Sequence, residues 1–289
     1  MGYSQKSPFE NTLRPSDSLN HIRKNTVLIS EIAIGAGTLI GLNQLWYADY
    51  PRSNFHFIND NSDWLQMDKA GHAFSSYHLG RLSSEMLKWS GVSKRKQLLY
   101  GSGVGFVFLT AVEVLDGYSS QWGASTGDII ANASGTALYV SQELIWNEQR
   151  ITPKFSFHTT KYADLRPDVL GSSFSEQILK DYNGQTYWLS FNLYSFAKGT
   201  KIPKWLNLAV GYGAEAMISA NQKNNSIYSS TGTRPFRQFY LSLDINLTKI
   251  NTNSSLLKTL FSVINTIKVP APTIEFKRFN DVKYHLIYF

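Results

Sequence analysis

The chain has 289 residues, of which 17% are charged and 14% aromatic, and its 28 basic and 21 acidic residues give a net charge of +7. These figures argue against disorder and predict a folded chain with much buried or lipid-facing surface. The basic residues are scattered apart from "KRK" at 94–96, so we expect no nucleic-acid partner and instead an attraction to an anionic membrane surface. The lack of cysteine excludes disulfides, thiolate metal sites and a lipidated cysteine in the chain as given.

The first 25 residues are polar, contain Pro8 and Pro15, and lack the apolar core of a signal peptide. We therefore expect residues 1–25 to be a polar N-terminal segment of a mature protein. On this interpretation a signal peptide is absent from the sequence because it was removed, and Met1 and Gly2 were added for expression.

Residues 26–150 contain four stretches with the pattern of helices. Residues 26–47 and 98–115 are apolar almost all round, 68–89 is amphipathic, and 125–146 begins with Ser125 or Thr126 as a plausible N-cap. We predict a bundle of about four helices. Hydropathy alone leaves open whether the two apolar runs contact lipid or form the core of a soluble bundle.

Closely spaced glycines occur in both apolar runs. Gly35, Gly37 and Gly41 lie in the first, and Gly101, Gly103 and Gly105 lie in the second. Such glycines allow the backbones of neighbouring helices to approach closely, so we expect them at helix contacts.

From about residue 185 the period changes from helical to alternating, most clearly in residues 237–247. We predict that 151–184 is a polar connector and that 185–289 forms about five antiparallel strands, with a helix inserted within 256–272. The fold class is then α+β: a membrane-associated apolar bundle with a C-terminal antiparallel sheet or partial barrel. The aromatic C-terminal residue, Phe289, is typical of outer-membrane barrels, although a closed barrel needs at least eight strands.

Polar pairs in otherwise apolar helices are the candidate site. Asp68 and His72 are spaced i and i+4, as are Asp128 and Asn132, and Glu113 and Asp116 are spaced i and i+3, so each pair shares a helix face. If the three faces converge, they form one polar cluster, to which Lys69 also belongs. The candidate catalytic residues are His72, Asp68, Glu113, Asp116 and Asp128, and the candidate substrate-binding residues are Lys69 and Asn132.

Three interpretations of this cluster are open. The one we favour is structural, with polar groups that satisfy one another and fix the packing of the helices. The second is enzymatic, with His72 as a general acid or base oriented by Asp68, and with Lys69 binding an anionic group of a lipid or lipid-linked phosphate. The third is a metal site built from His72 with Asp68, Asp116 or Asp128, which a single histidine supports only thinly, so we expect no metal or cofactor.

The constellation resembles the pattern of VanZ-like membrane proteins and of the YfiM-like family of bacterial envelope proteins. The matching stretches are "DKAGH" at 68–72, the glutamate at 113, and "GDIIANASG" at 127–135. Residues 166–190 are similar to the longer form of the YfiM-like family found in Bacteroidota. VanZ-like proteins tend to have Gln three residues after the Glu, whereas this chain has Asp116. The resemblance implies an envelope protein and carries no established activity.

We therefore expect an uncharacterised protein in or at the outer membrane of a Gram-negative bacterium, with a structural or partner-binding role. The alternative is a membrane-interface enzyme acting on a lipid or lipid-linked phosphate. The expected partners are membrane lipid or lipopolysaccharide, and an outer-membrane protein complex.

Overall fold

The computed structural model describes residues 8–48, 50–221, 225–277 and 281–289, so residues 1–7 of the expected polar segment 1–25 lie outside the described residues. The chain divides into two compact units, each described here by itself. The helical unit comprises residues 1–60, 72–148 and 253–259, and the sheet unit comprises residues 61–71, 149–252 and 260–289.

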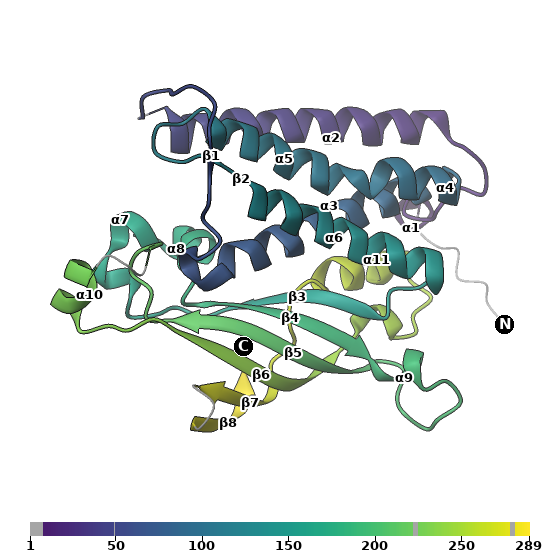
Figure 1. Ribbon diagram of the computed structural model, residues 1–289. Helices are drawn as coiled ribbons and strands as arrows, with labels where there is room; N and C mark the ends of the chain where they lie inside the picture. Colours follow the sequence, from purple (N-terminus) through teal and green to yellow (C-terminus); the bar gives the residue numbers. More distant parts are fainter. Residues whose placement is uncertain (1–7, 49, 222–224, 278–280) are drawn as a thin grey trace. The chain divides into compact units, whose positions relative to one another are not determined.

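Helices dominate the helical unit (Figure 1). They are α1 (Pro8–Thr12), α2 (His21–Leu42), α3 (Met67–Trp89, of which the part from His72 belongs to this unit), α4 (Lys94–Lys96), α5 (Gly103–Gly117) and α6 (Thr126–Ile145). Two π-helical turns, Asn43–Tyr47 and Gln97–Gly101, follow α2 and α4. A short parallel pair, β1 (Phe57–Ile58) with β2 (Ala124–Ser125), precedes α6.

The four helical stretches expected from the sequence correspond to α2, α3, α5 and α6, but the number of helices is larger than predicted. The described residues contain helices α1 to α11 rather than about four. The helix expected within 256–272 is α11 (Ser255–Ile264). The other additional helices are short, and a helix of one or two turns is too brief to show an apolar period. At α6 the expected N-cap is Ser125, whose side chain accepts a hydrogen bond from the Asp128 amide.

Glycines fit α3 closely to its neighbours within the helical unit. A Cβ atom added at Gly105 would lie 2.2 Å from the Ser76 carbonyl oxygen, and one at Gly135 would lie 2.1 Å from the Ala73 carbonyl oxygen. The expected contact at Gly101 is also present, whereas a Cβ atom at Gly103, Gly37 or Gly41 would meet no described atom within 4 Å. These close approaches fix α5 and α6 on the face of α3 that carries His72 and Ser76.

The sheet unit contains an antiparallel sheet, as the alternating pattern predicts, and the sheet has six strands rather than about five. The strands pair in chain order: β3 (Ile151–Phe157), β4 (Gln185–Asn192), β5 (Leu206–Glu215), β6 (Phe236–Ile245), β7 (Ala271–Lys277) and β8 (Asp281–Tyr288). The remaining helices are α7 (Pro167–Leu170), α8 (Phe174–Lys180), α9 (Leu193–Phe196), α10 (Asn225–Thr231) and α11 (Ser255–Ile264, of which only the part from Leu260 belongs to this unit). The expected connector 151–184 contains β3, α7 and α8.

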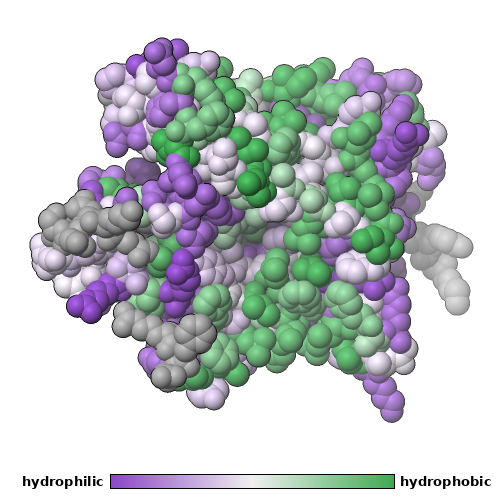
Figure 2. Space-filling model, in the orientation of Figure 1, coloured by the Kyte–Doolittle hydropathy of each residue, from purple (hydrophilic) through white to green (hydrophobic). Residues whose placement is uncertain are grey.

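The two faces of this sheet have an unusual polarity. On β6, Gln238, Ser242 and Asp244 are buried, whereas Phe239 and Leu243 are each 46% exposed. Figure 2 shows the apolar side chains at the surface over strands β4 to β6. The buried face of the sheet is therefore largely polar, and much of the opposite face is apolar.

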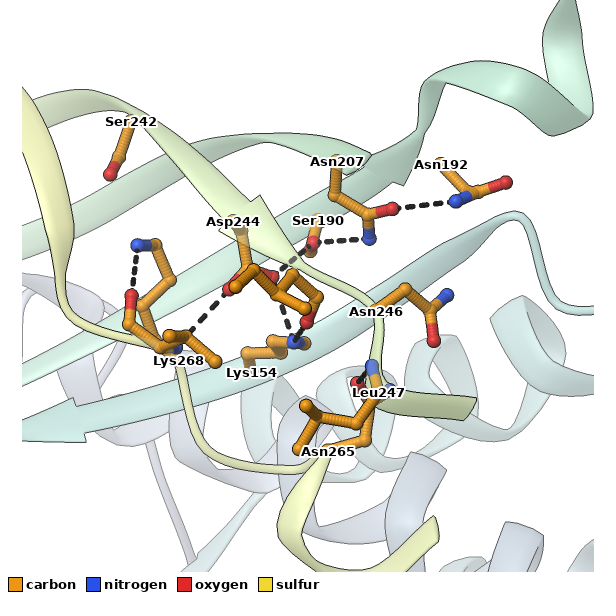
Figure 3. Close-up of polar contacts among 12 residues, drawn as sticks. Lys154, Ser190, Asn192, Asn207, Ser242, Asp244, Asn246, Leu247, Asn265 and Lys268 are labelled. Carbon is orange, nitrogen blue, oxygen red and sulfur yellow. Dashed lines mark hydrogen bonds and ion pairs between the residues drawn. The ribbon is translucent and has the colours of Figure 1, made fainter. Parts of the chain in front are cut away.

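Polar side chains on the buried face of the sheet form a connected network of hydrogen bonds and ion pairs (Figure 3). Lys154 forms an ion pair of 2.8 Å with Asp244, which accepts a hydrogen bond of 2.6 Å from Ser190. Asn207 donates to Ser190. Residues 266–268 hydrogen-bond to Phe155 at the outer edge of β3, and they bring Lys268 beneath the sheet, with its ammonium 5.0 Å from the Trp188 ring centre.

Candidate functional site

Three helices of the helical unit bring His72, Glu113 and Asp128 together. His72 Nε2 lies 3.7 Å from Glu113 Oε1 and 3.9 Å from Asp128 Oδ1. The two carboxylates are buried, at 2% and 5% exposed, whereas the His72 side chain is 22% exposed. α3, α5 and α6 each supply one residue, so the predicted convergence of polar faces occurs for these three side chains.

Asn132 sets the orientation of the His72 ring. Its Oδ1 lies 3.0 Å from His72 Nδ1, and because an amide oxygen only accepts, Nδ1 carries the proton of this bond. In neutral His72 the lone pair is then on Nε2, the atom that faces the two carboxylates. Asn132 is one turn beyond Asp128 on α6, as the i, i+4 spacing predicts.

Ser125 connects Glu113 to the start of α6. Its amide donates to Glu113 Oε2 at 2.9 Å, and its hydroxyl donates to Asp60 Oδ1 at 2.5 Å. The same hydroxyl oxygen accepts the Asp128 amide at 3.1 Å as the N-cap of α6. One serine thus holds one oxygen of Glu113 and fixes the helix turn that carries Asp128.

Burial makes Glu113 and Asp116 harder to ionise. It raises the pKa of Glu113 to about 8, a rise opposed by the hydrogen bond from the Ser125 amide and increased by the carboxylates of Asp128, Asp116 and Asp60. Burial also raises the pKa of Asp116 to about 6, against the hydrogen bond from Tyr47 and the attraction of His72. The cluster would therefore be stabilised by positive charge.

Asp116 is hydrogen-bonded by Tyr47. The Tyr47 hydroxyl donates to Asp116 Oδ1 at 2.6 Å, and Asp116 is not one of the three residues whose atoms face one another. Burial and the nearby Asp116 raise the pKa of Tyr47, which keeps this hydroxyl protonated. Tyr47 closes the π-helical turn after α2, and nothing in the sequence pattern pointed to it.

Asp68 and Lys69 belong to the sheet unit. Lys69 Nζ lies 2.9 Å from Asp68 Oδ2, and the Lys69 amide donates to Asp68 Oδ1 at the same distance. Burial, together with the charge of Asp68, raises the pKa of Tyr187 on β4. His72 belongs to the helical unit, and each unit is described by itself. The expected role of Asp68 and Lys69 beside His72 therefore stays a prediction.

The cluster in the helical unit is not fully paired. His72 Nε2 is too far from either carboxylate for a hydrogen bond. Asn132 is fully buried, and its Nδ2 has no hydrogen-bond partner among the described residues. A polar cluster that served only to lock helices together would satisfy such groups. This arrangement instead leaves His72 Nε2 without a hydrogen bond to either carboxylate, and it leaves the buried Asn132 amide without an acceptor.

Sequence reasoning missed Asp60 and Tyr47, and it recognised Ser125 only as a helix cap. Asp60 lies in a loop and Tyr47 in a helix end, so neither stands in a periodic pattern. Their partners, Ser125 and Asp116, are 65 and 69 residues away along the chain, a separation at which no local spacing rule applies.

The cluster lies in a segment of the chain that is similar to a known protein family. Residues 56–142 match a family model described as a predicted periplasmic lipoprotein, DUF2279. The DUF2279 segment contains His72, Glu113, Asp116, Asp128 and Asn132. Its description indicates an uncharacterised protein of the bacterial envelope. No curated protein and no solved structure matches the chain.

Proposed function

We propose that this chain is a membrane-bound protein of the Gram-negative envelope, at the outer membrane, whose helical unit binds a small polar ligand at His72, Glu113 and Asp128. The more specific resemblance to YfiM-like and VanZ-like proteins belongs to this proposal. The similarity of residues 56–142 to DUF2279 supports the envelope location. The observation that carries the membrane part is the exposure of α2.

α2 has 22 residues, and among those described only Val27 is buried. Ile29, Ile32 and Ile34 are 66%, 71% and 69% exposed. Two segments, His21–Leu42 and Lys94–Gly117, are long and apolar enough to cross a membrane by length and composition. The second fits closely against α3 through Gly101 and Gly105, whereas α2 presents isoleucines to its surroundings. We therefore assign lipid contact to α2, because such exposure in water is unfavourable.

The binding part of the proposal depends on the incomplete pairing of the cluster. Helix packing alone would not leave His72 Nε2 beyond hydrogen-bond reach of two buried carboxylates. Catalysis at a lipid headgroup, the other function considered from the sequence, would also begin with binding at these atoms.

Membrane attachment is tested by fractionation of the full chain expressed in a Gram-negative host. We expect the protein to sediment with membranes, to resist alkaline carbonate and to dissolve in detergent. Ile29→Ser with Ile32→Ser should shift it toward the soluble fraction, because the change removes apolar contact with lipid without touching Val27. The matched control, Ile29→Leu with Ile32→Leu, should remain in the membrane.

A wild-type protein that stays in the soluble fraction without detergent would contradict the membrane proposal. A density gradient that separates inner from outer membranes tests the location, and recovery with the inner membrane would contradict it.

A further inference from the structure

The three facing atoms of the cluster have the spacing of ligands around one metal ion. His72 Nε2, a carboxylate oxygen of Glu113 and one of Asp128 all lie within 4.8 Å of one another. An ion held by bonds of about 2.0–2.2 Å at near-tetrahedral angles keeps its ligand atoms roughly 3.3–3.6 Å apart. The distances of 3.7 and 3.9 Å from Nε2 exceed this only slightly, and the two carboxylate oxygens lie within 4.8 Å of each other, so the three side chains would draw closer to hold one ion.

Two of the three residues are anchored through the atom that does not face the centre. Asn132 holds His72 by Nδ1 and leaves Nε2 free to coordinate. The Ser125 amide holds Glu113 by Oε2 and leaves Oε1 facing inward. Outer partners of this kind orient the ligands of metal sites and fix the histidine tautomer. The anchoring is therefore that of a preorganised donor set.

The charge of the cluster also favours a cation. Glu113 and Asp128 are buried carboxylates, and Asp116 and Asp60 add negative charge around them. A divalent ion at the centre would offset the cost of burying these groups more effectively than a single protonated imidazole. A cation is therefore the ligand that this electrostatic environment fits.

The unsatisfied amide of Asn132 is an independent sign of a missing ligand. Asn132 is fully buried beside His72, and its Nδ2 donor has no acceptor among the described residues. Three protein ligands leave at least one coordination position for water or another oxygen ligand. The Asn132 amide lies on the Nδ1 side of the His72 ring, so it marks a buried polar group beside the cluster that lacks a partner.

We propose that His72, Glu113 and Asp128 bind one divalent transition-metal ion, with Asn132 and Ser125 as the residues that position the ligands. A mixed set of imidazole and carboxylate donors suits Zn²⁺ or Mn²⁺, whereas Mg²⁺ and Ca²⁺ prefer oxygen alone. This inference rests on the proposed function, because it names the ligand of the same cluster.

Metal binding is measured on full-length protein purified in detergent through a tag without histidine and stripped with a chelator. Titration calorimetry with ZnCl₂ and with MnCl₂ should show one site per chain for at least one ion, with weaker binding of MgCl₂ and CaCl₂. Co²⁺ should give a visible absorption band that Zn²⁺ abolishes. His72→Gln and Glu113→Gln should each weaken binding more than about 100-fold, and Asn132→Leu about 10–100-fold, as expected for a positioning residue.

Asp116→Asn is the matched control, because it removes a neighbouring carboxylate that accepts a hydrogen bond from Tyr47 and is not one of the three proposed ligands. It should keep one site, with affinity within about tenfold of wild type. Circular dichroism shows whether each variant is folded. Absence of a Zn²⁺ or Mn²⁺ site in folded wild type, or equal affinity in wild type and folded His72→Gln, overturns the metal site. Neither result bears on membrane fractionation, so failure of this inference is separable from failure of the membrane proposal.

Discussion

Single atoms decide how the helices of this protein approach one another. Gly105 faces the Ser76 carbonyl on α3, whereas Gly103, two residues earlier in the same helix, has no described neighbour within 4 Å of an added Cβ. The sequence predicts helix contact at both positions, because glycine spacing indicates that backbones can approach but not which glycine faces the partner.

This difference predicts opposite results for the same substitution. Gly105→Ala should lower the free energy of unfolding by roughly 1–3 kcal/mol, because the added methyl group collides with backbone. Gly103→Ala should be neutral or stabilising by up to about 1 kcal/mol, because alanine favours helix. Thermal or urea unfolding in detergent, followed by circular dichroism, measures both. Equal effects of the two substitutions would contradict the packing described for α3 and α5.

At the scale of elements, the sheet has a polar interior. Lys154, Asp244 and Lys268 are almost completely buried on one side, whereas Val210 and Leu243 are 47% and 46% exposed on the other. The alternation of β6 is evident in the sequence, but alternation alone does not say which face is buried. β3 was not predicted from the sequence, because Pro153 and Lys154 lie at its centre. The structure tolerates Pro153 in this strand because β3 is at the edge of the sheet.

Burial of Lys268 predicts a pH dependence for the stability of the sheet unit. Desolvation lowers the pKa of Lys268 to about 8, against the attraction of Asp244 and helped by the repulsion of Lys154. Between pH 8 and the ordinary lysine value, the unfolded chain binds more protons than the folded one, so stability rises with pH. From pH 7.5 to 9.5 this group should add about 2 kcal/mol.

Urea unfolding at pH 7.5 and 9.5 measures this effect. Wild type should become more stable at the higher pH, and Lys268→Met should lose most of that gain. Lys283→Met, at an exposed position on β8, is the control and should behave as wild type. A gain that is the same in Lys268→Met and wild type would show that Lys268 is not the group responsible.

At the scale of the whole molecule, the described residues bury many polar side chains and expose many large apolar ones. The composition of the chain predicts lipid contact, which stays a prediction. Its periodicity predicts an α+β fold with four long helices and an antiparallel sheet, which the structure has. The convergence of His72, Glu113 and Asp128 could be predicted from helix faces. The positions of Asp116 and Asn132 relative to those atoms could not, because they depend on Tyr47 and on the rotation of α6 against α3.

The central claim is that the cluster around His72 is a binding site and does not serve only to fix the packing of the helices. The most direct test is the free energy of unfolding of metal-free wild type and His72→Gln, measured in detergent at neutral pH. Tyr47→Phe serves as the reference, because losing its hydrogen bond to buried Asp116 should cost about 1–3 kcal/mol.

We predict that His72→Gln lowers the free energy of unfolding by about 1 kcal/mol or less, because Nε2 makes no hydrogen bond to the carboxylates and only the hydrogen bond from Nδ1 to Asn132 is lost. A loss of about 3–5 kcal/mol, as expected when one partner of a buried ion pair is removed, would contradict the account and make the cluster a structural lock.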